Sequence, residues 1–326
     1  MKKLLLLAAF GLFASPAFAQ TNISSDVDQS GPSDNQAQVD QAGTNLSSDI
    51  DQTSAAPVSG QPDKDLVADV DQDGTDLTSD IDQVGAGGAF AKVDQDGNLD
   101  WARIDQNASY YVDQQARIFQ TGNGAALNRA DIEQQGWGGN QIARIDQIGE
   151  DNDARIDQAH FGVTSTVDQD GISHFARVEA NALAGERPSF GNRVQSTQSV
   201  EQTGSDGIGH SARQRMGVGG TDMDGGNSMR IRQLLGDDND ARQDMTATGA
   251  AVDKNNTQII DQLGGTGNYA FQSTAGNGGP YEGNFARVVQ DTCTDCSATQ
   301  RQFGSFNDAR TDQSGSNHVA NVTQSQ

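Results

Sequence analysis

The sequence predicts an all-β protein: a parallel two-sheet β-solenoid of strand-turn half-repeats of about 11 residues, with about 22 residues in each rung. Three observations support this fold class. A triplet of Val or Ile, an acidic residue and Gln recurs every 11 or 12 residues over most of the first half of the chain. Apolar and polar residues alternate around each triplet, and glycine commonly follows it. A disordered chain of this polarity would need no such register.

The triplet defines the expected strands in order. In the regular part it occurs at Val27–Gln29, Val39–Gln41, Ile50–Gln52, Val70–Gln72, Ile81–Gln83, Val93–Gln95, Ile104–Gln106, Val112–Gln114, Ile132–Gln134, Ile145–Gln147, Ile156–Gln158 and Val167–Gln169. Later copies are more widely spaced, at Val200–Gln202, Ile260–Gln262, Val288–Gln290, Thr311–Gln313 and Val322–Gln324. Glycine-rich insertions separate several of these, and insertions in solenoids become loops.

The clearest half-repeat runs from Gln147 to Gln158. Residues 154–158 read Ala-Arg-Ile-Asp-Gln, so Ala, Ile and Gln point to one face of a strand and the charged residues to the other. β-Branched Ile suits the central inward position. Gly149 tolerates the backbone geometry of the turn that separates successive strands. Each half-repeat is therefore one short strand followed by one turn.

An inward glutamine makes physical sense only in a repeating stack. Rungs stack about 4.7–4.8 Å apart, so identical amides lie over one another, and each can donate to one neighbour and accept from the other. A buried amide without such a ladder would be costly. We therefore predict that ladder and core positions of the two best half-repeats carry assembly: Gln147, Asn152, Ile156 and Gln158 in one, and Gln302, Asn307 and Gln313 in the other, with turns at Gly149 and Gly304.

Four segments are expected along the chain. Residues 1–19 have the basic start, apolar run and Ala-Phe-Ala ending of a secretory signal peptide, and the apolar run is too short for a membrane anchor. Residues 20–25 form a polar leader, 26–182 a regular repeat array, and 183–326 looser repeats with Gly-rich insertions. An export signal predicts a protein that acts outside the cytoplasm.

Composition and charge exclude several classes of function. The formal net charge of −24 makes nucleic acid a poor partner. The carboxylates recur in every unit, as expected of a charge-alternating surface, and no nucleophile with a base, phosphate loop or paired-carboxylate site stands out. The sequence therefore predicts neither an enzyme nor a bound cofactor or metal.

The pattern Gln-x-Gly-x-x-Asn-x-Ala-x-x-x-Gln resembles the curlin repeat. It is complete at two places, from Gln147 to Gln158 and from Gln302 to Gln313, and partial over most of the remaining chain. Curlins are the subunits of curli, the extracellular amyloid fibres of Gram-negative biofilms. The second half of this chain is less regular than the family pattern, and Ala often stands where the family begins the strand with Ser.

The resemblance implies a secreted subunit that self-assembles into cell-surface fibres for biofilm matrix and adhesion. It also implies two partners besides further copies of the chain, namely a curli-type outer-membrane secretion pore and a nucleator. The main subunit, a nucleator and a non-polymerising relative all stay open. A second hypothesis is a monomeric β-solenoid that acts as a surface adhesin or scaffold. A third, an enzyme on a β-helix, is disfavoured by the Gln-rich interior.

Three further motifs have a structural interpretation that we prefer to a chemical one. Residues 69–74 read Asp-Val-Asp-Gln-Asp-Gly, like the start of a calcium loop, but they also contain the repeat triplet and lack flanking helices. His174, His210 and His318 each lie two residues before an Ala, at the Asn position of the repeat. We expect their imidazoles to replace an amide at a polar corner rather than to bind metal.

Cys293 and Cys296 are the only cysteines. A Cys-x-x-Cys redox site would need a βαβ context, and a zinc site would need a second pair of ligands. A short loop disulfide formed in an oxidising compartment is therefore the preferred interpretation.

Overall fold

The computed structural model describes residues 22–55, 64–85, 87–108, 113–122, 126–136, 140–159, 162–182, 196–204, 209–219, 227–248, 256–276, 283–304 and 306–325. Throughout these residues the chain is all-β and its strands form two parallel sheets, so the predicted fold class is confirmed. The expected signal peptide, 1–19, lies outside the described residues, as do residues 20–21 of the leader.

The odd-numbered strands form one sheet, called the odd sheet below. Its members, in order, are β1 (Ser24–Ser30), β3 (Ser47–Ser54), β5 (Thr78–Gly85), β7 (Trp101–Ala108), β9 (Arg129–Gly136), β11 (Asp153–Ala159), β13 (Phe175–Ala182), β15 (Ser211–Gly219), β17 (Asp240–Thr248), β19 (Tyr269–Gly276), β21 (Ser297–Phe303) and β23 (Val319–Ser325).

The even-numbered strands form the second sheet, called the even sheet below. It contains β2 (Gln36–Thr44), β4 (Leu66–Thr75), β6 (Gly88–Asn98), β8 (Asp113–Gly122), β10 (Gln141–Glu150), β12 (Val163–Ile172), β14 (Ser196–Thr203), β16 (Ser228–Leu234), β18 (Thr257–Thr266), β20 (Phe285–Thr294) and β22 (Asp308–Ser316).

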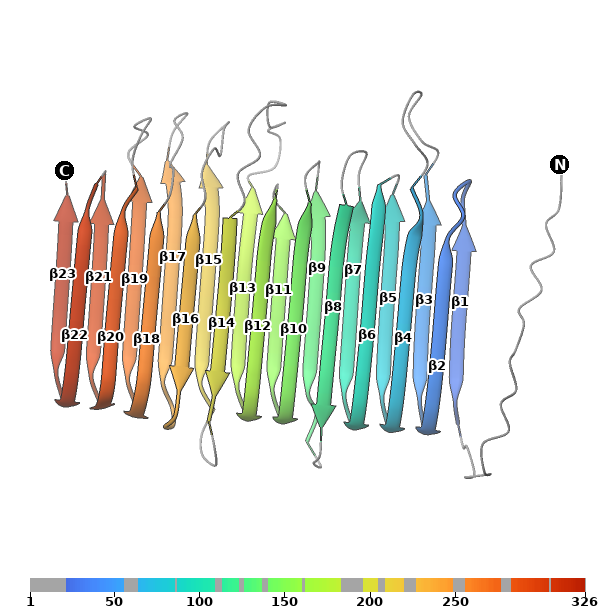
Figure 1. Cartoon of the computed structure of the whole chain (residues 1–326), viewed down its shortest axis with the longest axis horizontal. Helices are drawn as coiled ribbons and strands as arrows, with labels where there is room; N and C mark the ends of the chain where they lie inside the picture. The colour runs from blue at the N-terminus through green and yellow to red at the C-terminus, as the bar shows by residue number, and fades with distance from the viewer. Residues whose placement is uncertain are drawn as a thin grey trace, which may run out of the picture.

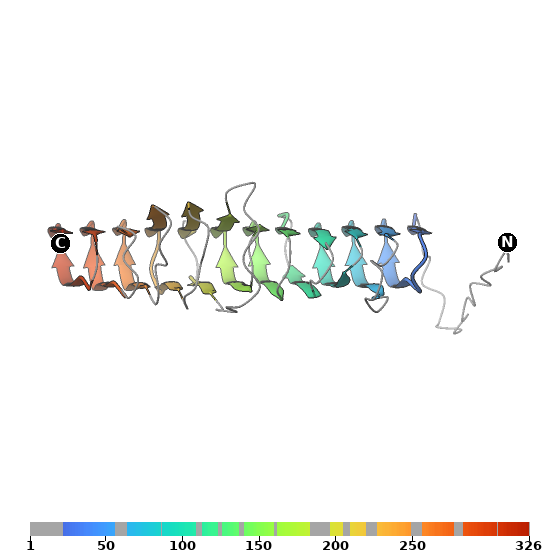
Figure 2. The same ribbon diagram turned by 90° about the horizontal axis from the view of Figure 1, so that it is seen from above.

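The two sheets lie face to face along one long axis. Figure 1 shows the strands side by side from β1 at one end to β23 at the other, and Figure 2 shows the two layers from above. Each rung contains one odd and one even strand, and successive rungs pair in parallel. The looser region, 183–326, continues the same two sheets, because β13 pairs with β15 and β12 pairs with β14.

Alternation of side chains decides which face of each strand is buried. In β10, Ala143, Ile145 and Gln147 are buried, while the residues between them are more exposed. The register places the same repeat position over itself, with Ile145 opposite Val167 and Gln147 opposite Gln169. This rung spans the predicted 22 residues.

The core is a continuous stack of Ala, Ile and Val shared by both sheets, flanked by buried glutamines. Among the described residues, no helix is long and apolar enough to cross a membrane.

One expected strand centre is wrong. Gln114, from the triplet at 112–114, lies near the start of β8, where it bonds Gln141. The ladder position of that strand belongs instead to Gln120, which pairs with Gln147. The reason is that Ala116, stacked on Ala143, sets the register, and the ladder glutamine lies four residues after this alanine.

Candidate functional site

An unbroken column of glutamines runs through the even sheet from β2 to β22. Each Nε2 donates to the Oε1 of the next rung, at 2.7–2.9 Å. The members are Gln41, Gln72, Gln95, Gln120, Gln147, Gln169, Gln202, Gln233, Gln262, Gln290 and Gln313. The second Nε2 hydrogen is also used, since Gln147 donates to the backbone carbonyl of Arg129 in the odd sheet at 3.0 Å. The ladder therefore binds neighbouring rungs together and the two sheets to each other.

The odd sheet has a second ladder that changes position. It runs from Gln29 to Gln158 through one glutamine per strand. At β11, Gln158 donates instead to Ser165 Oγ of the even sheet at 2.8 Å, and Ser165 Oγ lies 3.2 Å from Gln198 Oε1. In the next odd strand, Ala180 occupies the glutamine position, adjacent to Gln198, which donates to the Glu179 carbonyl. In both rungs a large residue of one sheet therefore faces a small residue of the other: Gln158 faces Ser165, and Gln198 faces Ala180.

Beyond this crossover the odd-sheet ladder moves to the central position of the strand. Side-chain hydrogen bonds of 2.9–3.0 Å, from Nε2 to Oε1, join the glutamines at this position: Gln214, Gln243, Gln272 and Gln300. Sequence reasoning missed this column because the triplet is absent from β15, β17 and β19. The signal was the alanine two residues earlier, as in Ala212 before Gln214.

Each of the two best half-repeats is divided between the two sheets, and the two run in opposite order. Gln147 and Gln313 belong to the even-sheet ladder, whereas Gln158 and Gln302 lie in the odd sheet. Ile156 is fully buried in the core. The two asparagines occupy opposite corners, since Asn152 connects β10 to β11 and Asn307 connects β21 to β22.

A column of residues, all buried except the last, follows the corner that contains Asn152, where each even strand leads into the next odd strand. Its members, from Leu46 to His318, are Leu46, Leu77, Asp100, Asn128, Asn152, His174, His210, Asn239, Asn268, Cys296 and His318. We call it the Asn152 corner column. Asn128 Oδ1 accepts from the backbone N–H of Asn152 at 3.1 Å, and Asn152 Oδ1 accepts from that of His174 at 3.0 Å. The side chains of Asn128 and Asn152 thus hold the corner of the following rung.

Asparagines also line the opposite corner in the looser half of the chain. The backbone N–H groups of Asn256, Asn284 and Asn307 each donate to the side-chain oxygen of the preceding asparagine, beginning with Asn227, at 2.9–3.1 Å. Both corners therefore use the same bond, because an asparagine at this position supplies an acceptor beside the backbone of the next rung.

Three positions of the Asn152 corner column carry ionisable groups with shifted pKa values. Burial raises the pKa of Asp100 to about 6, although hydrogen bonds from Asn128 oppose the shift. Burial, followed by the adjacent His174, lowers the pKa of His210 to about 4. Burial also lowers the pKa of His174. The rings of His174 and His210 are stacked, with centroids 5.1 Å apart.

The two predicted turn glycines have positive φ angles, 112° at Gly149 and 87° at Gly304. Gly149 lies within the last residues of β10 rather than beyond the strand, because its backbone still pairs with Gly171. A Cβ at Gly149 would lie 2.0 Å from the carbonyl oxygen of Gly171. Glycine is therefore required there by both the backbone angle and the close approach of the next rung.

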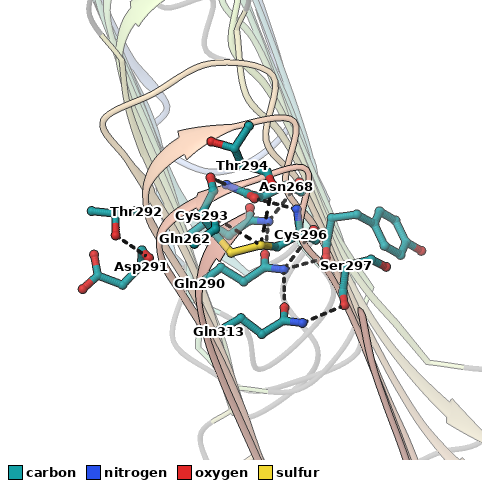
Figure 3. Close-up of a disulfide and its surroundings, with 12 residues drawn as sticks. Gln262, Asn268, Gln290, Asp291, Thr292, Cys293, Thr294, Cys296, Ser297 and Gln313 are labelled. Atoms are coloured by element: carbon teal, nitrogen blue, oxygen red, sulfur yellow. Dashed lines mark hydrogen bonds between the residues drawn. A yellow bond between two sulfur atoms is a disulfide. The ribbon is translucent and has the colours of Figure 1, made fainter. Parts of the chain in front are cut away.

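The two cysteines form a disulfide between Cys293 and Cys296 in the rung of β20 and β21, and both are buried (Figure 3). Cys293 stacks between Gly265 and Gly315, so it takes a glycine position, and Cys296 takes the asparagine position of the corner. In several rungs an asparagine Nδ2 bonds the next rung at this corner, as when Asn268 donates to the Cys293 carbonyl at 2.7 Å. Cys296 has no such amide, and its Sγ is bonded covalently to Cys293 of its own rung.

Charge is distributed unevenly along the outward face of the odd sheet. In β1, β3 and β5 both central outward positions are aspartate: Asp26, Asp28, Asp49, Asp51, Asp80 and Asp82. Burial, then repulsion from Asp51, raises the pKa of Asp49. In β7, β11, β13 and β17 one of these two positions is instead an arginine: Arg103, Arg155, Arg177 and Arg242. Fully buried Asp261 of the even sheet contacts Arg230, Arg232 and Arg287 at 3.2–3.4 Å.

The two ends of the stack are edge strands. Every residue of β1 is exposed, and Val27, which occupies a core position in later rungs, is 42% exposed. At the other end, β23 pairs only with β21 among the described strands. Its inward residues are Ala320, Val322 and Gln324, the same repeat positions as Ser25, Val27 and Gln29 of β1.

The residues of the calcium-like motif lie in strand β4, where Asp69 and Asp71 point outward and Asp69 lies 3.6 Å from Lys92 Nζ. Within the described ranges, no group of three or more His, Cys, Asp or Glu residues could hold a metal ion. No protein-family model matches the chain, and a search of curated proteins finds no match.

Proposed function

We propose that this chain is a secreted, curlin-like structural subunit that stacks end to end with further copies to form an extracellular fibre for biofilm matrix and adhesion. The observation that carries the proposal is the equivalence of the two end rungs. Val322 and Gln324 of β23 occupy the repeat positions of Val27 and Gln29 of β1. Unpaired strand edges are templates for further pairing.

The direction of the amide ladders supports a head-to-tail contact. In both ladders Nε2 donates toward the C-terminal end and Oε1 accepts from the N-terminal side. The first oxygens of the ladders are therefore those of Gln29 and Gln41, and the last amides are those of Gln324 and Gln313. A second copy whose β1 lies on β23 would continue both ladders without reversing an amide. The export pore and nucleator implied by the resemblance belong to this proposal as partners.

A non-polymerising solenoid that serves as a surface adhesin or scaffold is the second candidate. The six outward aspartates of β1, β3 and β5 favour it, because like charges beside an edge strand oppose association. Protonation would weaken this repulsion. Burial raises the pKa of Asp80 and of Asp82, which brings their titration closer to mildly acidic pH. If the chain polymerises, we therefore expect faster assembly at mildly acidic than at neutral pH.

The test compares two lysine substitutions on the same end strand. Val322→Lys places a charge in the interior of the end rung, whereas Val319→Lys places it on the outer face, where Val319 is 71% exposed. The mature chain and both variants are followed by thioflavin fluorescence and electron microscopy at neutral and mildly acidic pH. We expect the mature chain and Val319→Lys to form fibres with a reflection at about 4.7–4.8 Å, and Val322→Lys to stay monomeric.

Circular dichroism and a refolding check show whether Val322→Lys remains β-rich, which separates blocked stacking from failed folding. A mature chain that stays monomeric and β-rich at both pH values would exclude the fibre proposal and support the second candidate. Fibres formed equally fast by both variants would show that the end rung is not the contact.

A further inference from the structure

Three buried methionines converge on one point of the interior. Met216 of β15 and Met245 of β17 are register partners in the odd sheet, and Met229 of β16 joins the same packed cluster from the even sheet. Their side chains are no more than 4% exposed. The sequence contains five methionines, and the other two, Met1 and Met223, are outside the described residues. Methionine is therefore concentrated at one level of a stack that otherwise uses Ala, Ile, Val and Gln.

At this level methionine replaces glutamine at two other inward positions, while both amide ladders continue past it. Met216 and Met245 occupy the position that Gln158 fills in β11, and Met229 lies between Gln198 and Gln258 in the even sheet. The Gln198 amide approaches the Met229 sulfur at 3.9 Å, a long contact. Filling this space would require only an apolar side chain such as Leu, so packing alone does not explain the choice of a thioether three times.

Two buried side-chain carbonyl oxygens belong to residues that neighbour the cluster in register or in sequence. Gln258 Oε1 lies one rung after Met229 in the same column, and Gln214 Oε1 lies on β15 two residues before Met216. Neither oxygen has a hydrogen-bond partner, because the residue before it in the column is not a glutamine that could donate. Met229 precedes Gln258, and Val178 precedes Gln214. Gln114 Oε1 also has no partner, because its neighbour in the preceding rung is Ala89, which has no donor. No thioether is present at that position. Among the described rungs, the methionine level is the one that combines soft ligands with unsatisfied carbonyl dipoles.

We propose that Met216, Met229 and Met245 form a binding site for a soft monovalent metal ion, Cu(I) or Ag(I). Thioether sulfur is a soft ligand that selects Cu(I) over hard cations such as Ca²⁺ and Mg²⁺. The negative ends of the Gln214 and Gln258 amide dipoles offset part of the cost of burying a single positive charge. The site lies within one molecule, so it does not depend on fibre assembly.

Silver is the probe, because Ag(I) needs no reductant and leaves the Cys293–Cys296 disulfide intact. The full mature chain is refolded with AgNO₃ in chloride-free buffer, since the ligands are buried and metal binding of this kind is coupled to folding. Bound silver is counted after desalting, and thermal unfolding is recorded with and without the ion. We expect one equivalent of Ag(I) and a higher unfolding temperature in its presence.

The variant Met216→Leu/Met229→Leu/Met245→Leu keeps the volume of the core and removes all three sulfurs. The matched control is Met223→Leu, which removes the methionine of the intervening segment, outside the described residues. We expect the control to bind silver like the parent chain and the triple variant to bind none. Gln258→Leu, which removes a neighbouring dipole, should weaken binding on the order of tenfold.

X-ray absorption on the silver-loaded parent chain gives a readout that needs no variant. Three sulfur neighbours support the site. Nitrogen neighbours would assign the ion to His174 and His210 and overturn the proposal. Absence of bound silver in the parent chain, or silver retained by a folded triple variant, would also overturn it and would leave the methionines as packing residues.

Discussion

The Nδ1 atom of His174 accepts a hydrogen bond from the backbone N–H of His210 at 3.0 Å. One rung earlier, the side-chain oxygen of Asn152 accepts from the backbone N–H of His174 in the same way. A histidine can take this asparagine position only as the neutral tautomer that carries its proton on Nε2, because a protonated Nδ1 would face a donor. The corner therefore requires uncharged imidazole, in agreement with the lowered pKa values of both rings.

Acid should weaken this part of the stack. The unfolded chain binds protons at His174 and His210 below about pH 6.5, whereas the folded chain resists protonation until about pH 4 at His210. The carboxylates of Asp170, Asp237 and Asp238 favour the charged rings but do not outweigh burial. The stabilising contribution of neutral His210 is therefore present above pH 6.5 and is lost as pH falls toward 4, by about 3 kcal/mol at most.

The double variant His174→Asn/His210→Asn should remove this dependence, because asparagine supplies the same acceptor and does not titrate. Guanidinium midpoints at several values between pH 7 and 4 measure the effect. His318→Asn, at an exposed position of the same column, serves as the control. An equal loss of stability in the parent chain and the double variant over this range would contradict the assignment.

Asp100 predicts the opposite dependence. Its folded pKa of about 6 lies above the ordinary value of 3.8, so ionisation of the buried carboxyl costs free energy above pH 6. Asp100→Asn restores the amide found at Asn128 and Asn152. We expect the variant to be more stable than the parent by about 2–3 kcal/mol at pH 7, with the gain vanishing near pH 4.

Chemical denaturation at the two pH values checks this prediction. Asp34→Asn removes the same charge from an exposed position and should change stability by less than about 0.5 kcal/mol. A gain that is the same at pH 4 and pH 7 would point to packing rather than to ionisation.

The amide ladder makes a separate prediction. Gln147→Leu leaves one N–H of the Gln120 amide and the Oε1 of Gln169 without partners inside the protein, while the other N–H of Gln120 keeps its bond to the Trp101 carbonyl. Each unsatisfied buried group costs about 1–3 kcal/mol, so we expect a loss of about 2–6 kcal/mol. Gln115→Leu, on the exposed face of β8, is the matched control and should be close to neutral. Equal stability of the two variants would mean that the ladder does not stabilise the stack.

The disulfide is expected to stabilise one corner and not the whole fold. A loop of four residues closed by a disulfide contributes about 2 kcal/mol in the chain-entropy treatment. Reduction should therefore lower stability by about this amount, as measured by denaturation with and without reductant. Cys293→Gly/Cys296→Asn restores the residue types of the other rungs and should recover part of the loss under both conditions. A double variant less stable than the reduced parent would show that the amide tie cannot replace the disulfide at this corner.

Much of the fold follows from local patterns. The alternation in residues 154–158 and the glycine after each strand predict short strands and turns, and the 22-residue spacing of Gln147 and Gln169 predicts a two-strand rung. The asparagine position correctly placed His174 and His210 at a corner. The triplet failed at 112–114, because stacking of Ala116 on its neighbours decides the register of β8.

The sequence by itself determined the period, the strand faces and the identity of the stacking residues, because side-chain alternation and glycine placement act within one half-repeat. Only the tertiary structure decided that the glutamine of the odd sheet moves inward after Gln158, since that depends on the size of Ser165 and Gln198 in the facing sheet. It likewise decided that Asn152 and Asn307 lie at opposite corners and that Met229 clusters with methionines of the other sheet. These relationships join residues of different rungs or different sheets, and their distances are set by packing rather than by spacing along the chain.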